Sequence, residues 1–176
     1  MAILHLAIYD ALVQVLKLKQ DTKRKAPFEQ HTTIKILAEP SAPSGYICEW
    51  SAAAAVSHRI IGYYFPEYGS SLDSLLNRFK VARLRTGLQY ESDIEMGMAI
   101  GNEIAGKYVD YAKIDFTDME WKGKVPNDKT LWSGTPNKWG PVKAQWKPLT
   151  LLDTDQFRPG PPPTDWTADM EELREF

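Results

Sequence analysis

Apolar residues recur at spacings of three and four along the first twenty positions of the chain. Ile8, Leu12, Val15 and Leu16 follow this period, and no glycine or proline interrupts it. The pattern predicts an amphipathic α-helix over residues 2–20. Because its start carries no Ser, Thr, Asp or Asn cap, we expect the preceding chain to have been cut off or to lie elsewhere.

A polar connection follows this helix. Residues 21–25 form a run of charged and polar side chains, for which we expect a solvated loop. Pro27 and Pro40 bracket most of the remaining connection, which also lacks a helical period. We therefore predict a loop up to residue 47.

Two helices are predicted next, and each has a clear stop. Residues 48–65 include a run of alanines that would let a neighbouring helix approach closely, and Pro66 ends the segment. Residues 72–85 carry an apolar stripe, and Gly87 follows as a typical C-terminal cap. The stripe consists of Leu72, Leu75, Leu76, Phe79 and Ala82.

A fourth helix is predicted from Ser92 to about residue 112. Ser92 and Glu95 have the spacing of a capping box, in which each side chain bonds the backbone amide of the other residue. Apolar residues then continue at helical spacing as far as Ala112. Four such helices predict an all-α fold, a helical bundle that occupies residues 1–115.

The helical period is lost from residue 116 onward. Prolines there alternate with tryptophans, among them Trp121, Trp132, Trp139 and Trp146. This composition predicts an extended Pro/Trp-rich arm over residues 116–176, whose tryptophans pack on the bundle or on a partner. A short acidic helix is expected at about residues 167–175.

Charge and cysteine content exclude several functional classes. The chain has 176 residues and a net charge of -2 at pH 7, so it offers no basic field to hold nucleic acid or an anionic membrane. Its single cysteine, Cys48, excludes an internal disulfide and argues against a cysteine metal site. No apolar stretch approaches the ~18 residues of a membrane span, and no secretory leader is visible. We expect a soluble chain, and the sequence leaves its compartment open.

Short motifs in the bundle carry a resemblance to a known superfamily. Residues 43–46 read Pro-Ser-Gly-Tyr and precede the alanine-rich helix, and residues 82–89 read Ala-Arg-Leu-Arg-Thr-Gly-Leu-Gln, with Asp93 four positions later. Lys19 is followed at the appropriate distance by Pro27. In this order the motifs resemble those of the vanadium-dependent haloperoxidases and type-2 phosphatidic-acid phosphatases.

The tail strengthens the resemblance. Residues 131–134 read Leu-Trp-Ser-Gly, and residues 155–159 read Asp-Gln-Phe-Arg-Pro before a run of prolines. Both segments look like the tail of the bacterial haloperoxidase-like members. The resemblance therefore covers nearly the whole chain and implies the C-terminal, catalytic-bundle portion of that fold.

The resemblance also implies an anion site. In the superfamily a lysine, two arginines, a serine hydroxyl and a glycine amide surround a phosphate or a bound vanadate, which is charge-assisted recognition. The matching positions here are the anion-binding candidates Lys19, Ser44, Gly45 and Arg83. Phosphate or vanadate is thus the ligand that the resemblance implies, and we expect no other cofactor.

The groups that would make and break bonds are replaced. Tyr46 stands where the superfamily has its acid/base histidine, and a phenol with a pKa near ~10 is a poor proton shuttle at neutral pH. Gln89 stands where the nucleophilic or vanadium-ligating histidine would be, and an amide nitrogen neither attacks phosphorus nor ligates vanadium. Asp93 matches the residue that orients this histidine, and Ala26 replaces one arginine. The resemblance therefore implies a degenerate site without ordinary turnover.

Structural explanations compete with these assignments. In these explanations Lys19 ends a helix in solvent, Arg83 pairs internally with Asp93 or another carboxylate, and residues 44–45 form only a helix-starting turn. The three histidines, His5, His31 and His58, fall in no motif. Only the loop that carries His31 could reach the pocket.

Three functional hypotheses follow. In the first, the chain is a degenerate structural or interaction subunit, whose exposed bundle face is covered by a protein partner or by a second copy. In the second, it binds an oxyanion without turnover. In the third, it is an active phosphatase or vanadium haloperoxidase with relocated catalytic groups, such as His31 or Tyr46, or with histidines from another chain.

Overall fold

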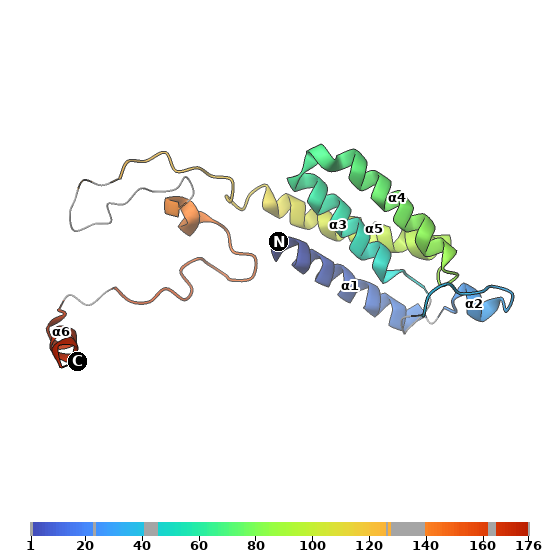
Figure 1. Ribbon diagram of the computed structural model, residues 1–176, viewed down its shortest axis with the longest axis horizontal. Helices are drawn as coiled ribbons and strands as arrows, with labels where there is room; N and C mark the ends of the chain where they lie inside the picture. Colours follow the sequence, from blue (N-terminus) through green and yellow to red (C-terminus); the bar gives the residue numbers. More distant parts are fainter. Residues whose placement is uncertain are drawn as a thin grey trace. The chain divides into compact units, whose positions relative to one another are not determined.

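The computed structural model describes residues 2–22, 24–40, 46–125, 127, 140–161 and 165–175. Within these ranges it contains helices and no strand, which confirms the all-α prediction (Figure 1). The α-helices are α1 (Ala2–Thr22), α2 (Pro27–Gln30), α3 (Glu49–Tyr64), α4 (Gly69–Arg85), α5 (Glu91–Ala112) and α6 (Thr167–Arg174). Two 3₁₀ helices, η1 (Pro66–Tyr68) and η2 (Gly140–Gln145), complete the described elements.

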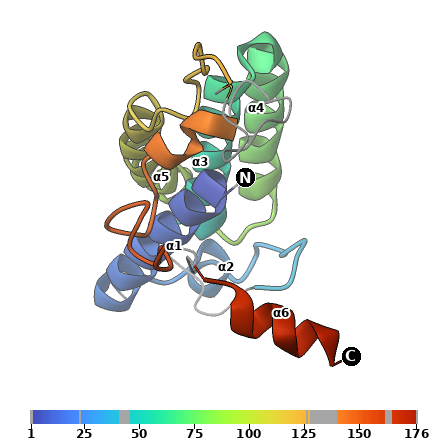
Figure 2. The ribbon, with the colours of Figure 1, turned by 90° about the vertical axis from the view of Figure 1, so that its left-hand side faces the viewer.

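The chain divides into two compact units, Met1–Ile114 and Asp115–Phe176. The first contains α1 to α5, and α3 contacts α1, α4 and α5 (Figure 2). No helix in the described part of the chain is both long and apolar enough to cross a bilayer.

Small residues bring α3 and α5 close together. A Cβ atom added at Gly97 would overlap the carbonyl oxygen of Cys48, and one added at Gly101 would overlap that of Ala52. Only glycine at these two positions permits the observed backbone approach, because any side chain would push the helices apart. The main core lies between α1, α3 and α5 and consists of Ile3, Ala7, Ala11, Val15, Ile47, Ala52, Val56, Ile60, Ala105, Val109 and Ala112.

Helix α4 differs from the other long helices because none of its described side chains is fully buried. Leu76 and Phe79 pack against a small cluster that includes Cys48 and Met98, while Leu75 remains 57% exposed. The predicted apolar stripe of this helix therefore exists but is only partly covered.

Two local predictions are wrong. The connection predicted as a loop contains α2, since Pro27 favours the first turn of a helix and the Glu29 carboxylate accepts the Ala26 amide at 2.6 Å. Ser92 does not cap the next helix but lies inside it. The Asp93 carboxylate instead accepts the Tyr90 amide at 2.8 Å, which satisfies a donor that precedes the first turn.

Tyr108 makes a pH-dependent contact between α1 and α5. Its hydroxyl donates to Asp10 Oδ2 at 2.7 Å. Burial, and after it the hydrogen bond and charge of Asp10, raise the pKa of Tyr108 to about 12. The contact is thus strongest while the phenol keeps its proton.

We expect the stability difference between the wild type and Tyr108→Phe to depend on pH. Because a tyrosine in the unfolded chain titrates near ~10, the contribution of Tyr108 is complete below about pH 10 and is lost towards about pH 12. Urea unfolding of both proteins should show the advantage of the wild type shrinking across this window. An advantage that stays constant over the same range would contradict the shifted pKa.

The second unit has little regular structure in its described part. The Lys147 amide donates to the Asp115 carbonyl oxygen at 2.9 Å, and the Asp115 carboxylate accepts the Thr117 amide at 2.9 Å. Trp146 is half-buried, Trp166 is exposed, and the predicted terminal helix is present as α6. Trp132 and Trp139, for which packing was predicted, lie outside the described residues.

Candidate functional site

Segments that are far apart in the sequence meet at the end of the bundle that carries α2 (Figure 1). The C-terminal turn of α1 brings Lys19 there, and the C-terminal turn of α4 brings Arg83. The residues that precede α3 and α5 supply Tyr46 and Gln89. Hydrogen bonds and ion pairs between these segments define the candidate site.

Lys19 and Glu49 form a buried ion pair across α1 and α3. The ammonium nitrogen lies 2.6 Å from Glu49 Oε2, and the two side chains are 3% and 16% exposed. A charge removed from water to this extent requires a partner of opposite sign. Lys19 is therefore not a solvated helix end, and its charge is matched by a carboxylate of the protein itself.

Arg24 occupies the centre of the site, although its segment was predicted to be a solvated loop. Its guanidinium donates to Asp93 Oδ1 at 2.8 Å and to the Ser92 hydroxyl at 3.2 Å. It also lies over two aromatic rings, 4.4 Å from the Tyr90 centroid and 5.5 Å from that of Tyr46. Arg24 lies in the site rather than in a solvated loop because the Asp93 side chain is fully buried and its negative charge attracts a cation.

Arg83 bonds a different partner from the one considered in the sequence. Its Nη2 donates to the Gln89 side-chain oxygen, whereas Asp93 pairs with Arg24. Gln89 is only 4% exposed, so this bond satisfies a buried amide. The Arg83 Nε is also buried and has no hydrogen-bond partner within the described part of the chain.

Backbone conformation fixes the two loops that carry Tyr46 and Gln89. Gly87 has φ 75°, and a Cβ there would also lie 2.8 Å from Ile34, so glycine is required. Ile47 has φ 63° although it is β-branched and buried, a conformation that costs roughly 1–3 kcal/mol. The next residue anchors this loop, since the Cys48 amide donates to the Asp93 carbonyl oxygen at 2.9 Å.

The remaining sequence-derived candidates contribute less. Ser44 and Gly45 lie outside the described residues. Ala26, which stands where the resemblance implies an arginine, is buried at the start of α2.

None of the three histidines takes part in the described contacts of the site. His58 pairs with Asp73 at 2.8 Å between α3 and α4, His5 lies in α1, and His31 is exposed after α2. The described residues also contain no cluster of three His, Cys, Asp or Glu side chains able to hold a metal ion.

The geometry brings together a set of cations, each already bonded to a group of the protein. Lys19 faces Glu49, Arg24 faces Asp93, and Arg83 faces Gln89. Among these residues and their partners, Arg24, Glu49 and Tyr90 were not sequence-derived candidates. The burial of Asp93, which only the structure shows, accounts for Arg24, since a buried carboxylate requires a cation nearby.

Comparison with known proteins assigns no family to this chain. No protein-family model, curated protein or solved structure matches it.

Proposed function

We propose that this chain is a non-catalytic member of the vanadium haloperoxidase and type-2 phosphatidic-acid phosphatase superfamily, acting as a structural or interaction subunit. The motifs described above support membership, because they occur in the superfamily's order and their described residues meet at one end of a helical bundle.

The observation that carries the non-catalytic part of the proposal is the Lys19–Glu49 pair. An oxyanion site needs cations whose charge faces the ligand. Here the most buried cation bonds a carboxylate at 2.6 Å, and that carboxylate would repel a phosphate or a vanadate. Arg24 is likewise bonded to Asp93. Two of the three cations of the site are thus paired with carboxylates of the protein itself.

The side chains at the two key positions also support the loss of turnover. Tyr46 lies beside a guanidinium, and Gln89 accepts a hydrogen bond from Arg83. Neither a phenol nor an amide replaces the histidines that the resemblance implies as acid/base and nucleophile, and the loss of a general acid or base typically costs ~100 to 10,000-fold in rate. What remains is a folded bundle with an incompletely covered apolar face on α3 and α4.

A second candidate function is oxyanion binding without turnover. The observation in its favour is the buried Arg83 Nε, which lacks a described acceptor and could donate to an anion. In that case the Gln89 side-chain oxygen would hold the guanidinium in position by accepting a hydrogen bond from Arg83 Nη2.

Isothermal calorimetry with orthovanadate and with phosphate separates the two functions. We expect no binding heat from the wild type at millimolar anion, together with no phosphomonoester hydrolysis and no vanadate-dependent halide oxidation. Arg83→Ala should be equally silent, and Arg78→Ala on the same helix serves as the matched control. Heat from the wild type and from Arg78→Ala that disappears in Arg83→Ala would instead establish the oxyanion site. Turnover by folded protein would exclude both functions.

A further inference from the structure

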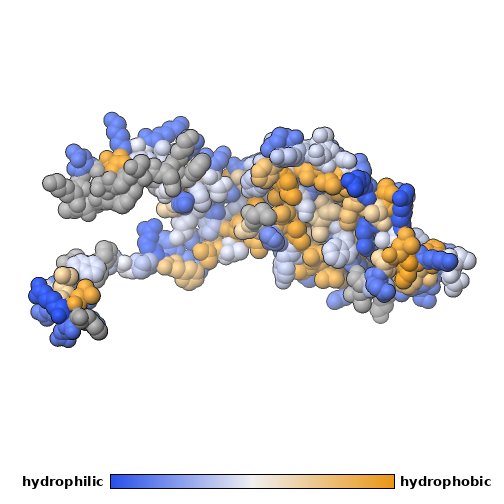
Figure 3. Space-filling model, viewed as in Figure 1, coloured by the Kyte–Doolittle hydropathy of each residue, from blue (hydrophilic) through white to orange (hydrophobic). Residues whose placement is uncertain are grey.

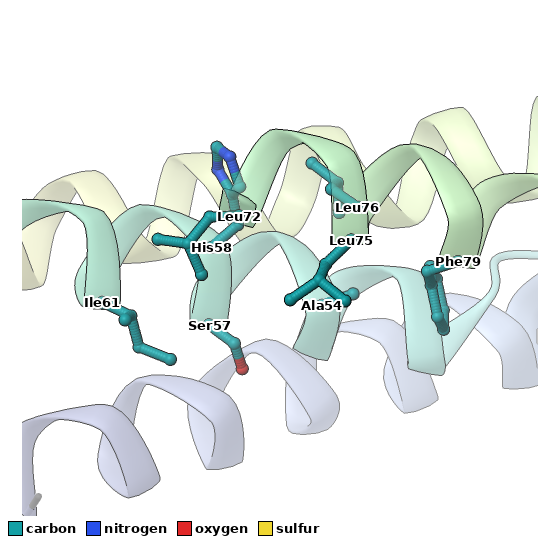
Figure 4. Close-up of a pocket in the computed structure, with 8 residues that line it drawn as sticks. All are labelled: Ala54, Ser57, His58, Ile61, Leu72, Leu75, Leu76 and Phe79. Carbon is teal, nitrogen blue, oxygen red and sulfur yellow. The ribbon is translucent and has the colours of Figure 1, made fainter. Parts of the chain in front are cut away.

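Two apolar surfaces of the described molecule differ in their charged surroundings. The hollow between α3 and α4, about 250 Å³ in volume, is lined mainly by apolar side chains of both helices (Figure 4). Its lining includes one ionisable side chain, His58, which is paired with Asp73 at 2.8 Å. Helix α6 also presents apolar side chains, and hydrophilic ones lie next to them (Figure 3). Of the two surfaces, α6 carries the charge pattern that distinguishes one class of partner from another.

Three large apolar side chains share one side of α6. Trp166, Met170 and Leu173 follow the i, i+4, i+7 spacing that brings residues to the same face of a helix. Trp166 immediately precedes the helix, and its carbonyl oxygen accepts the Met170 amide at 2.9 Å, so it takes part in the first turn. The three residues are 53%, 51% and 68% exposed, in chain order. With this spacing an amphipathic helix lays its anchors into the groove of another protein.

Asp165 holds the start of α6. Its carboxylate accepts the Thr167 hydroxyl at 2.6 Å and the Thr167 amide at 2.9 Å. These two hydrogen bonds, the hydroxyl's first, hold the pKa of Asp165 below its ordinary value. A helix of eight residues is nevertheless marginal in water without packing, and none of the described residues of α6 is buried. Burial of the apolar side against a partner supplies the contribution that the helix lacks.

The charge of this segment specifies the partner. Residues 165–175 contain five acidic side chains and a single basic one, Arg174, whereas the whole chain has a net charge of only -2. Asp169 lies three positions after Trp166 and four before Leu173, so it adjoins both anchors on the helix surface. Lysine and arginine at the rim of a groove would complement these carboxylates, and acidic side chains there would repel them.

The same charge disfavours the other surfaces that could cover an apolar stripe. Helices that lie in a membrane interface carry lysine and arginine on their polar side and are attracted to anionic lipid. The polar side of α6 has the opposite charge. A second copy of α6 would bring acidic side chains against acidic ones. The charge therefore favours a protein groove with a basic rim.

We propose that α6 is a docking helix for another protein, which receives Trp166, Met170 and Leu173 in an apolar groove rimmed by lysine and arginine. The groove is about 10 Å long, which is the rise of a helix over seven residues. The inference goes beyond the proposed function and does not depend on superfamily membership, because α6 alone carries it.

Site-specific photo-crosslinking of the full chain identifies this partner. A photoreactive benzoylphenylalanine takes the place of Arg174, next to Leu173, in the chain produced by its own organism. Mass spectrometry then locates the cross-linked peptide of the captured protein. We expect the cross-link to lie in an apolar groove with lysine and arginine at its rim. The captured protein is purified, and isothermal calorimetry measures its Kd for the full chain.

Leu173→Ala and Met170→Ala are each expected to raise this Kd at least about tenfold, since buried anchors carry most of the affinity of an interface. Leu152→Ala is the matched control, because Leu152 is 95% exposed in the same compact unit but outside α6, and it should bind like the wild type. Raising the salt concentration from about 0.1 to about 1 M should weaken binding several-fold, because the ion pairs at the rim are exposed to solvent. The melting temperature of the bundle should be the same in all variants.

Several results would overturn the docking helix. They are the absence of a cross-link above background, a cross-link outside a basic-rimmed apolar groove, and a Kd that Leu173→Ala leaves unchanged. Vesicles of phosphatidylcholine and phosphatidylserine test the membrane. Sedimentation of the full chain with these vesicles, lost in Leu173→Ala, would assign α6 to a lipid surface instead. Self-association of the full chain that the same variant abolishes would assign it to a second copy.

Discussion

Gly101→Ala is expected to lower the free energy of unfolding of the bundle by about 3 kcal/mol, at the upper end of the usual cost of overpacking. The new Cβ would overlap the Ala52 carbonyl oxygen and lie 2.9 Å from the Ala55 Cβ. Both obstacles are rigid, because one is helix backbone and the other is attached directly to it. Relief therefore requires α3 and α5, which both contribute residues to the main core, to separate.

Urea denaturation of the wild type and of two alanine variants measures this effect. Gly69→Ala is the matched control, because Gly69 is also helical and a Cβ there meets nothing within 4 Å. The control should be neutral or stabilising by up to about 1 kcal/mol, since alanine favours a helix over glycine. Equal stability of Gly101→Ala and the wild type would show that the two helices do not approach as closely as described.

Lys19→Met is expected to destabilise the bundle by about 2–4 kcal/mol. The substitution keeps the apolar stem but removes the ammonium group, so the Glu49 carboxylate loses a partner at 2.6 Å while remaining only 16% exposed. Breaking a buried pair from one side typically costs ~3–5 kcal/mol. We reduce this figure because Glu49 retains some contact with water.

A double-mutant cycle identifies the origin of the loss. Lys19→Met combined with Glu49→Leu should recover most of the stability, because an apolar pair can replace a buried ion pair at little cost. Lys107→Met breaks the exposed pair with Glu103 and should cost at most about 0.5 kcal/mol. If the double variant is as unstable as the sum of the single ones, the pair does not couple as the geometry requires.

The long helices could be predicted from the sequence because their periodicity is a local property. Helix α1 was predicted over residues 2–20 and spans Ala2–Thr22, and α3 ends at Tyr64, two residues before the predicted stop at Pro66. The start of α5 was predicted one residue too late, because capping depends on which side chain accepts the hydrogen bond from the backbone amide before the helix. Ser92 has the right chemistry and spacing, yet Asp93 bonds the Tyr90 amide and shifts the helix start.

The partners within the site could not be predicted from the sequence, because they depend on contacts between distant segments. Lys19 and Glu49 are 30 positions apart, and Arg24 and Asp93 are 69 positions apart. The sequence motifs identified several positions that do meet, including Arg83 and Gln89. They gave no indication that Arg24, from an apparently solvated charge run, would satisfy the buried carboxylate.

The weak burial of α4 has a consequence for how the bundle moves. A helix without a fully buried side chain opens at a lower free energy than the helices that carry the core, and its amide hydrogens exchange earlier. Because α4 carries Arg83, each opening also releases the guanidinium from Gln89. A ligand or partner that binds only the closed form of α4 would therefore also lengthen the lifetime of the contact between Arg83 and Gln89.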